Sequence, residues 1–382
     1  MRTWALITGE YPPAKGGVAD YTFLVARDLA AGGDEVHVFA PGTADPPPTL
    51  AGVTVHPLPD HYGGKALRYM SRTFRQLPSN TIKVVQYVPH GFGCKGMNLR
   101  FAWWVYRHRP VFTMFHEIIF AAVPGQPLRH RLLALATHHM ARLVIRASRH
   151  YFYSTPSWRE EAEKRGAIGI PSTWTPVPSN IATDAAHEQV TDLRRKHLRE
   201  PGELLVGHFG TYGNLISAML RPLLTQVLTR QPAARILLLG QGSERFLAQF
   251  QAESPTLAQR MTAAGALPST ELAVHLKACD LVLQPYPDGA CCRRGSLMAG
   301  MALGCPIVTT ANQRTEPIWQ ESEAVVLVPD ADVAAMADAA VALLEDPARR
   351  QELASRAKAL YETRFAVNVT VQALRAAAES AP

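Results

Sequence analysis

The sequence has few cysteines and lacks a long apolar run. Its 382 residues include five cysteines, an odd number without the spacing of a disulfide framework, so we expect reduced thiols and a cytoplasmic protein. The longest apolar stretch, Leu132–Ile145, is interrupted by His138, His139 and Arg142, and no segment is predicted to cross a membrane. Strand-like sequence begins at Thr3, so we expect no signal peptide.

Metal-ligand sets and a dinucleotide fingerprint are also missing. Cys291 and Cys292 are adjacent, but no further cysteine or histidine stands at ligand spacing, which disfavours a metal or redox pair. The Asp-x-Asp metal motif of Asp330–Asp332 follows a strand-like run, so Asp332 is interpreted instead as the N-cap of the next helix. The first glycine turn lacks the GxGxxG spacing, which disfavours a dinucleotide-dependent dehydrogenase.

Positive charge is concentrated in the first half of the chain. The net charge is +7, and residues 1–180 hold 20 Lys/Arg and 11 Asp/Glu, whereas residues 181–382 hold 19 and 21. This excess indicates an acidic partner, which would be an anionic membrane surface, a phosphorylated acceptor or nucleic acid. Nucleic acid is disfavoured because no binding motif accompanies the charge. Much of the excess lies in the predicted helix Arg129–Arg149, either a membrane-surface helix or an ordinary amphipathic helix with a basic outer face.

Short apolar strands alternate with helical segments throughout the chain, which predicts parallel α/β sheets. The expected strands are Trp4–Thr8, Glu35–Phe39, Val84–Tyr87, Val111–Phe115, Tyr151–Ser154, Leu204–Phe209, Arg235–Leu239, Met261–Ala264, Leu281–Gln284, Pro306–Thr309 and Ala324–Leu327. The expected helices include Ala19–Ala31, Leu128–Ser148, Leu215–Arg230, Ser243–Gln251, Ser269–Ala278, Gly295–Leu303, Asp332–Leu344, Pro347–Arg364 and Val367–Ala378.

The length of the chain favours two domains. A Pro/Ser/Thr-rich stretch over Pro171–Asn180, followed by polar sequence to His197, is interpreted as the passage between them. We therefore expect an α/β protein of two tandem Rossmann-like open parallel-sheet domains, 1–180 and 181–366, that face an inter-domain cleft. The last helix, about 367–380, is expected to pack back onto the first domain.

One polar motif, Arg293-Arg294-Gly295-Ser296, is suited to an anion. It follows the apolar run Leu281–Pro285 and opens a short predicted helix that ends before Pro306. Two guanidinium groups, a glycine, a hydroxyl and free helix N-terminal N–H groups at one place suit a ligand such as a pyrophosphate. The alternative is a solvated arginine pair beside an N-cap serine.

Further motifs follow one another along the chain. Glu10–Pro13 precedes the glycine turn and helix start Gly16–Tyr21, and Val206–Thr211 begins the second series of strands. Leu237–Gly242 is an apolar run ending in Gly-x-Gly, and Ala302–Val308 reads Ala-x-Gly-x-Pro followed by two apolar residues. In these motifs and their order the chain resembles the retaining glycosyltransferases of family four (group 1 type), which have the GT-B fold. The resemblance covers essentially the whole chain.

The resemblance implies an activity and a division of labour between the domains. Such enzymes move a sugar, here of hexosyl or N-acetylhexosaminyl type, from a nucleotide-diphosphate sugar to an acceptor hydroxyl. They retain the anomeric configuration and need no metal or other cofactor. The donor lies mainly on the C-terminal domain and the acceptor on the N-terminal domain. Apart from the resemblance, the positive charge of the first half suggests an anionic or lipid-linked acceptor and contact of the basic N-terminal domain with the inner face of the membrane.

The resemblance also implies donor-binding residues, which are Gly16, Gly17, Gly210, Thr211, Gly240, Leu267, Arg293, Arg294, Gly295, Ser296 and Leu297. His116 matches a family histidine at the donor sugar, although a strand-end histidine is often structural. Glu117 beside it would hold an acceptor hydroxyl or orient the imidazole. Tyr21, Gln86 and Tyr87 are candidates for the acceptor side, with packing on a helix or strand face as the alternative.

Two departures from the family pattern weaken the expectation of activity. Cys291 and Ala299 stand where the family has two glutamates, which accept hydrogen bonds from sugar and ribose hydroxyls. Asp288 would take over the first role, or be a plain turn aspartate, and Ala299 has no substitute in the sequence. Gly210–Ala218 also lacks the family's basic pair, which leaves the Arg293–Ser296 turn to neutralise the diphosphate.

These departures keep two alternatives open. One is a catalytically silent relative that binds a nucleotide sugar or a partner. The other is a GT-B nucleotide-sugar epimerase, which would need acid and base carboxylates in the cleft. The acidic residues that the sequence places there, Glu10, Glu117 and Asp288, do not form an evident pair.

Overall fold

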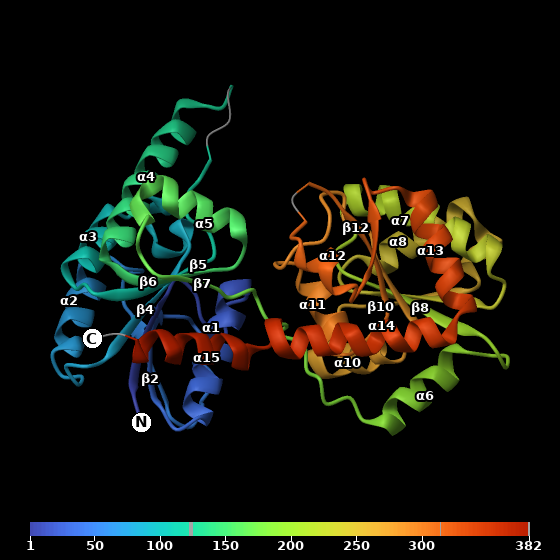
Figure 1. The fold of residues 1–382 in the computed structure, drawn as a ribbon, viewed down its shortest axis with the longest axis horizontal. Coiled ribbons are helices and arrows are strands. Elements are labelled where there is room, and N and C mark those ends of the chain that lie inside the picture. Colours follow the sequence, from blue (N-terminus) through green and yellow to red (C-terminus); the bar gives the residue numbers. More distant parts are fainter. Residues whose placement is uncertain (122–124, 314, 381–382) are drawn as a thin grey trace. The chain divides into compact units, whose positions relative to one another are not determined.

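The computed structural model describes residues 1–121, 125–313 and 315–380. The chain forms two compact units, each built on its own parallel sheet (Figure 1). The first unit contains Met1–Val177 and the final segment Val367–Pro382, and the second contains Pro178–Ala366. The first boundary lies in the proline-rich stretch of the sequence.

The sheet of the first unit has seven parallel strands in the order β3-β2-β1-β4-β5-β6-β7. Strands β1 and β5 are buried along their whole length, because helices cover both faces of the sheet. The strands are β1 (Thr3–Thr8), β2 (Glu35–Pro41), β3 (Val53–Leu58), β4 (Ile82–Tyr87), β5 (Val111–Phe115), β6 (Ser148–Tyr153) and β7 (Ser172–Trp174).

Two layers of helices cover this sheet. Apolar side chains of α2 (Gly64–Phe74), α3 (Leu99–Arg107), α4 (Leu128–Ala147) and α5 (Pro156–Ala162) share a core with one face. Those of α1 (Gly17–Ala31) and α15 (Val367–Glu379) share a core with the other face. Short irregular helices are η1 (Pro89–Phe92), η2 (Cys94–Gly96) and η3 (Glu163–Ala167).

The sheet of the second unit has six parallel strands in the order β10-β9-β8-β11-β12-β13. The order reverses between β8 and β11, and open sheets of this kind bind ligands at such a point. The strands are β8 (Leu204–Phe209), β9 (Ala234–Leu239), β10 (Met261–Gly265), β11 (Leu281–Gln284), β12 (Ile307–Ala311) and β13 (Val326–Pro329). The helices are α6 (His187–His197), α7 (Asn214–Arg230), α8 (Ser243–Glu253), α9 (Pro255–Ala258), α10 (Ser269–Lys277), α11 (Gly295–Ala302), α12 (Ile318–Ser322), α13 (Val333–Glu345), α14 (Pro347–Leu360) and η4 (Tyr361–Phe365).

Two strands and one longer helix correct the prediction from sequence, which also did not include the short helices α9 and α12. β3 and β7 were not predicted, and both lie at the edges of their sheet, where a strand is half exposed and lacks a continuous apolar run. The polar passage that was expected to run to His197 contains α6 instead. This helix packs onto the second unit through buried Val190 and through Arg194, which donates to the Ala278 carbonyl (2.6 Å) and to Asp280 (3.0 Å).

The last helix, α15, packs on α1 within the first unit. A charged cluster fixes it there, because the buried Asp34 carboxylate accepts hydrogen bonds from Arg375 (2.9 and 3.1 Å), from the Arg2 amide (2.9 Å) and from Trp4 Nε1 (3.0 Å). Burial by itself would raise the pKa of Asp34, but these hydrogen bonds lower it below its ordinary value. The ionised carboxylate therefore stabilises the first unit above about pH 4, and this contribution is lost as the pH falls further.

Replacing Arg375 by Ala should loosen α15, because it removes the charged partner of a buried carboxylate. We expect a loss of about 2 kcal/mol, the usual contribution of hydrogen bonds to a charged group. Hydrogen exchange of the α15 and β1 amides measures this loss. The matched control is Arg27→Ala, which breaks an exposed ion pair with Asp28 in the same unit and should cost less than about 1 kcal/mol. Equal protection of α15 in both variants would contradict the assigned role of Arg375.

Candidate functional site

The second unit has a cavity of about 550 Å³ at the carboxyl ends of its central strands. Its walls come from the turns after β8, β9 and β10 and from the start of α11. The lining residues are Asn180, Ile181, His208, Phe209, Gly210, Thr211, Ile216, Gly240, Gln241, Ala266, Leu267, Leu272, Gln284, Tyr286, Arg293, Arg294, Gly295 and Ser296. Eight of the donor-binding residues predicted from the sequence are among them.

A close approach of two turns shapes one wall of the cavity. Gly240 has a φ of 106°, and a Cβ at this position would lie 2.2 Å from the Gly210 carbonyl oxygen. Any side chain at residue 240 would therefore push apart the turns that follow β8 and β9. The glycine of the predicted Gly-x-Gly turn is needed for this packing.

The Arg293–Ser296 turn opens α11 and faces the cavity. Arg294 is held from two sides, by an ion pair with Asp288 and by the Tyr286 ring, whose centroid lies 4.7 Å from the guanidinium carbon. The Tyr286 hydroxyl is 2.7 Å from Ser296 Oγ. These contacts fix the arginine beside the first turn of the helix, where backbone N–H groups favour negative charge.

In the second unit, two residues predicted for the site lie outside the cavity wall. Leu297, on α11, is fully buried in the interior of the second unit and does not line the cavity. Asp288, proposed from the sequence as a replacement for a family glutamate, has an exposed side chain that pairs with Arg294. The ion pair with Asp288 orients the Arg294 side chain.

Cys291 and Ala299, which stand where the family has two glutamates, differ in their exposure. Cys291 is half exposed and Ala299 is fully buried. A carboxylate that the sequence did not single out, Glu316, is buried nearby and accepts hydrogen bonds from the Cys292 amide (3.2 Å) and Trp319 Nε1 (2.8 Å). Its carboxylate oxygens therefore accept hydrogen bonds within the protein. Burial raises the pKa of the Cys292 thiol, which leaves it unreactive.

The Asp-x-Asp motif has the structural role expected of it. Asp332 caps α13, because its carboxylate accepts hydrogen bonds from the amides of Ala334 (2.9 Å) and Ala335 (3.1 Å). Over residues 1–121, 125–313 and 315–380, no three His, Cys, Asp or Glu side chains gather as a metal site would require.

In the first unit, the glycine loop after β1 is occupied by a carboxylate of the chain itself. Glu10 Oε1 accepts hydrogen bonds from the amides of Val18 (3.1 Å) and Ala19 (3.2 Å) at the start of α1. A Cβ on Gly16 would lie 2.2 Å from this carboxylate, whereas one on Gly17 would meet nothing within 4 Å. Glu10 was not predicted to take this place, and contact of Gly16 and Gly17 with a donor stays a prediction.

His116 follows β5 and is buried against neighbouring side chains. Its Nε2 lies 2.9 Å from Gln86 Oε1, and its ring meets the Tyr21 ring edge-on at 4.7 Å. Since an amide oxygen only accepts, Nε2 carries the proton. Burial lowers the pKa of His116 to about 3, so the imidazole is neutral at physiological pH. Glu117, half-buried beside it, donates its amide to the Tyr87 carbonyl (3.3 Å).

The three residues predicted for the acceptor side are all buried. Gln86 is hydrogen-bonded to His116, and the Tyr21 ring packs edge-on against the His116 ring in the core that α1 and α15 share. Tyr87 lies in the core under α3 and α4. Packing, the alternative interpretation, accounts for Tyr21 and Tyr87 in this structure, and their contact with an acceptor stays a prediction.

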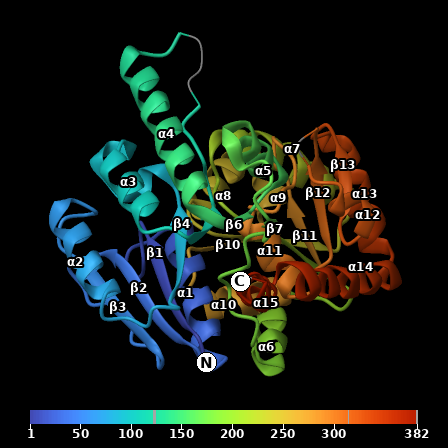
Figure 2. The ribbon, with the colours of Figure 1, turned by 60° about the vertical axis from the view of Figure 1, so that its left-hand side comes forward.

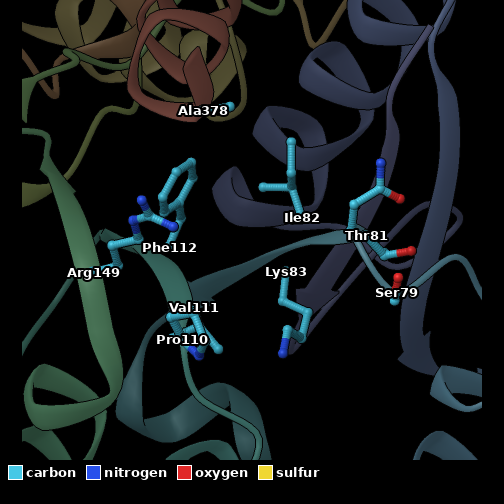
Figure 3. A pocket seen from close by; sticks show the side chains of 10 residues that line it. Ser79, Thr81, Ile82, Lys83, Pro110, Val111, Phe112, Arg149 and Ala378 are labelled. Atoms are coloured by element: carbon cyan, nitrogen blue, oxygen red, sulfur yellow. The ribbon is translucent and has the colours of Figure 1, made fainter. Parts of the chain in front are cut away.

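A second cavity, of about 210 Å³, lies at the amino ends of β4 and β5 (Figure 3). Lys83, Phe112 and Arg149 line it, and Lys83 Nζ donates to the His108 carbonyl (2.6 Å). The residues predicted for the site lie elsewhere. Because open parallel sheets bind ligands at their carboxyl ends, the amino-end cavity is not a candidate site.

Both units match known families. Residues 15–175 match the family described as Glycosyltransferase Family 4, and residues 204–346 match the family described as Glycosyl transferases group 1. The first match covers most of the seven-stranded unit, and the second covers the sheet of the other unit and all the cavity-lining residues except Asn180 and Ile181. No protein with a curated description matches the chain. Within the described residues, no helix combines the length and apolar character needed to cross a membrane.

Solved structures share the fold over the whole chain. Sucrose-phosphate synthase from Thermosynechococcus elongatus gives a TM-score of 0.69 at 16% identity, covering 100% of this chain and 99% of that one. HepE from Anabaena, solved with UDP, gives 0.66 at 16% identity over 100% of both chains. WaaG, a glycosyltransferase involved in lipopolysaccharide biosynthesis, gives 0.62 at 14% identity over 98% of both. The chain thus belongs to the glycosyltransferases of family four and group 1, and its two parallel-sheet units have the GT-B fold.

Proposed function

We propose that the protein is a retaining, metal-independent glycosyltransferase that moves a hexosyl or N-acetylhexosaminyl group from a nucleotide-diphosphate sugar to an acceptor hydroxyl. The observation that carries this proposal is the convergence of Gly210, Gly240, Leu267 and the Arg293–Ser296 turn on one cavity. HepE has been solved with UDP and with UDP-glucose, and the same class of donor fits a cavity with paired arginines.

The Arg293–Ser296 turn suits the charge that develops in such a transfer. When the bond between the anomeric carbon and the phosphate oxygen breaks, its electron pair stays on the diphosphate. Two guanidinium groups and the N–H groups that begin α11 stabilise that negative charge. They supply the positive charge that a divalent cation provides in other transferases, so the reaction needs no metal ion.

The acceptor oxygen then bonds to the anomeric carbon on the face from which the diphosphate leaves. Its proton passes to the leaving phosphate oxygen, so no protein base is required. Neutral His116, with its proton on Nε2 and directed at Gln86, would bind at the sugar and not act as a base. Asp288 takes part by positioning Arg294.

The composition of the cavity wall disfavours a nucleotide-sugar epimerase. None of the described lining residues is an Asp or Glu, whereas an epimerase needs acid and base groups beside the sugar. Glu10 is hydrogen-bonded to the start of α1 and Asp288 to Arg294. The catalytically silent relative remains the second candidate, favoured by Cys291 and Ala299 at the glutamate positions.

We further propose that the acceptor is lipid-linked and that a basic face of the first unit binds an anionic membrane. Residues 61–159 hold 15 Lys/Arg and a single acidic residue, Glu117. Helices α2, α3 and α4, which cover one face of the sheet, carry nine of these cations and no Asp or Glu. Such a surface attracts negatively charged headgroups.

An exposed apolar stripe accompanies this charge. Leu128, Leu132 and Leu135 on α4 are 69%, 56% and 58% exposed, and their spacing puts them on one face of the helix. Exposed Arg142 and Arg146 continue that face. In both views the first turns of α4 extend past the other helices of the unit (Figures 1 and 2). Apolar side chains at the tip and cations behind them suit insertion into a bilayer interface.

Turnover tests the enzymatic proposal. Incubation with UDP-, GDP- and ADP-sugars should release the nucleoside diphosphate from at least one donor, and an excess of EDTA should leave the rate unchanged. Binding of a donor without turnover, also in the presence of membrane lipid extracts as acceptors, would favour the silent relative. A rate abolished by EDTA and restored by Mg²⁺ would contradict metal independence.

Arg293→Ala and Arg294→Ala should each weaken donor binding about ten- to hundredfold, because a charge-assisted hydrogen bond contributes roughly 1.5–3 kcal/mol. Isothermal titration calorimetry measures the affinity. Arg230→Ala is the matched control, since Arg230 forms an exposed ion pair with Asp338 in the same unit. Unchanged donor affinity in both cavity variants would refute the diphosphate site.

Membrane binding should depend on the leucines of α4. The double variant Leu132→Ser/Leu135→Ser should bind phosphatidylglycerol vesicles about tenfold or more weakly, because it removes two apolar groups from the interface. Leu215→Ser, at a 72% exposed position of the second unit, is the control and should bind as the wild type does. Wild-type binding should also fade with added salt, which screens the attraction. Salt-insensitive binding, or equal binding of the double variant and of Leu215→Ser, would contradict the proposed membrane-binding surface.

A further inference from the structure

Two buried polar atoms without hydrogen-bond partners lie in the floor of the cavity of the second unit. They are Nε2 of His208 and Oε1 of Gln284. Both side chains are almost fully buried, at 2% and 0% exposure. Unpaired buried polar atoms are rare in proteins, and two at one cavity point to a ligand that donates hydrogen bonds to them.

The proton of His208 can be placed from its other nitrogen. Nδ1 lies 2.8 Å from the Leu283 carbonyl oxygen, which only accepts, so Nδ1 carries the hydrogen. Burial lowers the pKa of His208 to about 4, and the ring is therefore neutral at physiological pH. Nε2 then has a lone pair and no proton. A Cβ on Gly210 would lie 3.7 Å from Nε2, which places this atom beside the turn that borders the cavity.

The amide of Gln284 is oriented by the same reasoning. Its Nε2 lies 3.0 Å from the Phe209 carbonyl oxygen, so the nitrogen must face that carbonyl and the oxygen must face away. Oε1 is thus a second acceptor without a donor. His208 and Gln284 come from β8 and β11, the neighbouring strands at which the strand order reverses.

The polarity of the cavity therefore differs between its two parts. The floor presents two acceptors and needs hydrogen-bond donors from a ligand. At the Arg293–Ser296 turn the situation is the opposite, because Arg294 Nε is a buried donor without an acceptor. A diphosphate in a nucleotide sugar carries no protons at neutral pH. It can therefore accept a hydrogen bond from Arg294 but cannot donate one to the two acceptors of the floor. Hydroxyl groups can donate hydrogen bonds to these two acceptors.

We infer that His208 Nε2 and Gln284 Oε1 bind hydroxyl groups of the nucleotide sugar, an inference that rests on the proposed function. Both are neutral acceptors, and they stand in for the carboxylates that Cys291 and Ala299 cannot provide. The hydroxyls belong either to the ribose or to the transferred sugar. The hydroxyl acceptors of this protein are thus at the ends of β8 and β11, and not at residues 291 and 299 before and within α11.

Two substitutions remove the acceptors with little change of shape. His208→Asn keeps an amide N–H near the Leu283 carbonyl and removes Nε2, because the shorter amide has its only acceptor oxygen where the imidazole has Cδ2. Gln284→Met keeps the length of the side chain and removes its oxygen. Thermal melting and hydrogen exchange of β8 and β11 establish that each variant is folded. Leu272→Met, at a buried apolar position of the same cavity wall, is the matched control.

The experiment compares ligands that differ in hydroxyl groups. Calorimetry measures the affinity of inorganic pyrophosphate, of the ribonucleoside diphosphate and its 2′- and 3′-deoxy forms, and of the donor sugar with single hydroxyls removed. Wild-type protein should bind the matching deoxy ligand about tenfold or more weakly than the parent, since the acceptors stay unpaired. In His208→Asn or Gln284→Met this difference should disappear, while pyrophosphate affinity stays as in the wild type. Deoxy nucleotides showing the effect assign the ribose, and deoxy sugars assign the transferred sugar.

Other results would overturn the inference. If wild-type protein binds all deoxy ligands as tightly as the parents, water and not the ligand donates hydrogen bonds to the two floor acceptors. If both substitutions weaken pyrophosphate as much as the full donor, their effect is structural. A wild-type protein that binds pyrophosphate through Arg294 but no nucleotide would refute the proposed function itself, and this inference with it. Full donor turnover with an unchanged deoxy pattern in both variants would refute the inference alone.

Discussion

The candidate site depends on the reversal of strand order in the second sheet. β8 and β11 are hydrogen-bonded neighbours there, and the loops that follow them turn to opposite sides and leave a crevice at their ends. Every other feature uses that crevice. Gly240 lets two turns close against each other, the start of α11 brings cations to one end, and the two strand ends supply the floor. Without the reversal these groups would not meet.

The fold follows largely from local sequence, and its exceptions have a physical cause. β5, β8 and β11 have the predicted bounds, because central parallel strands are buried on both faces and appear as uninterrupted apolar runs. β3 and β7 escape this criterion, since edge strands need no such run. α6 was missed for a related reason: it buries little more than Val190 and is held by ion pairing, which leaves no apolar period in its sequence.

The site could be predicted only where it is contiguous along the chain. Glycine turns and the Arg293–Ser296 turn are short motifs, and the structure places them at one cavity. Contacts between distant segments have no such signal. The carboxylate of Glu10 at the start of α1 and the burial of Leu297 are examples. His208 carried one weak clue, a polar residue within an apolar strand, but its unpaired nitrogen depends on neighbours that only the fold supplies.

In the proposed complex, one cavity holds the diphosphate at its arginine turn and hydroxyl groups at its floor. A crystal structure of the protein with its nucleotide-diphosphate sugar tests this most directly. Phosphate oxygens should lie within about 3 Å of the Arg294 guanidinium and of the first α11 amides, and a hydroxyl should lie at the same distance from His208 Nε2 or Gln284 Oε1. A diphosphate bound elsewhere, or a floor that contacts only the base or water, would contradict it.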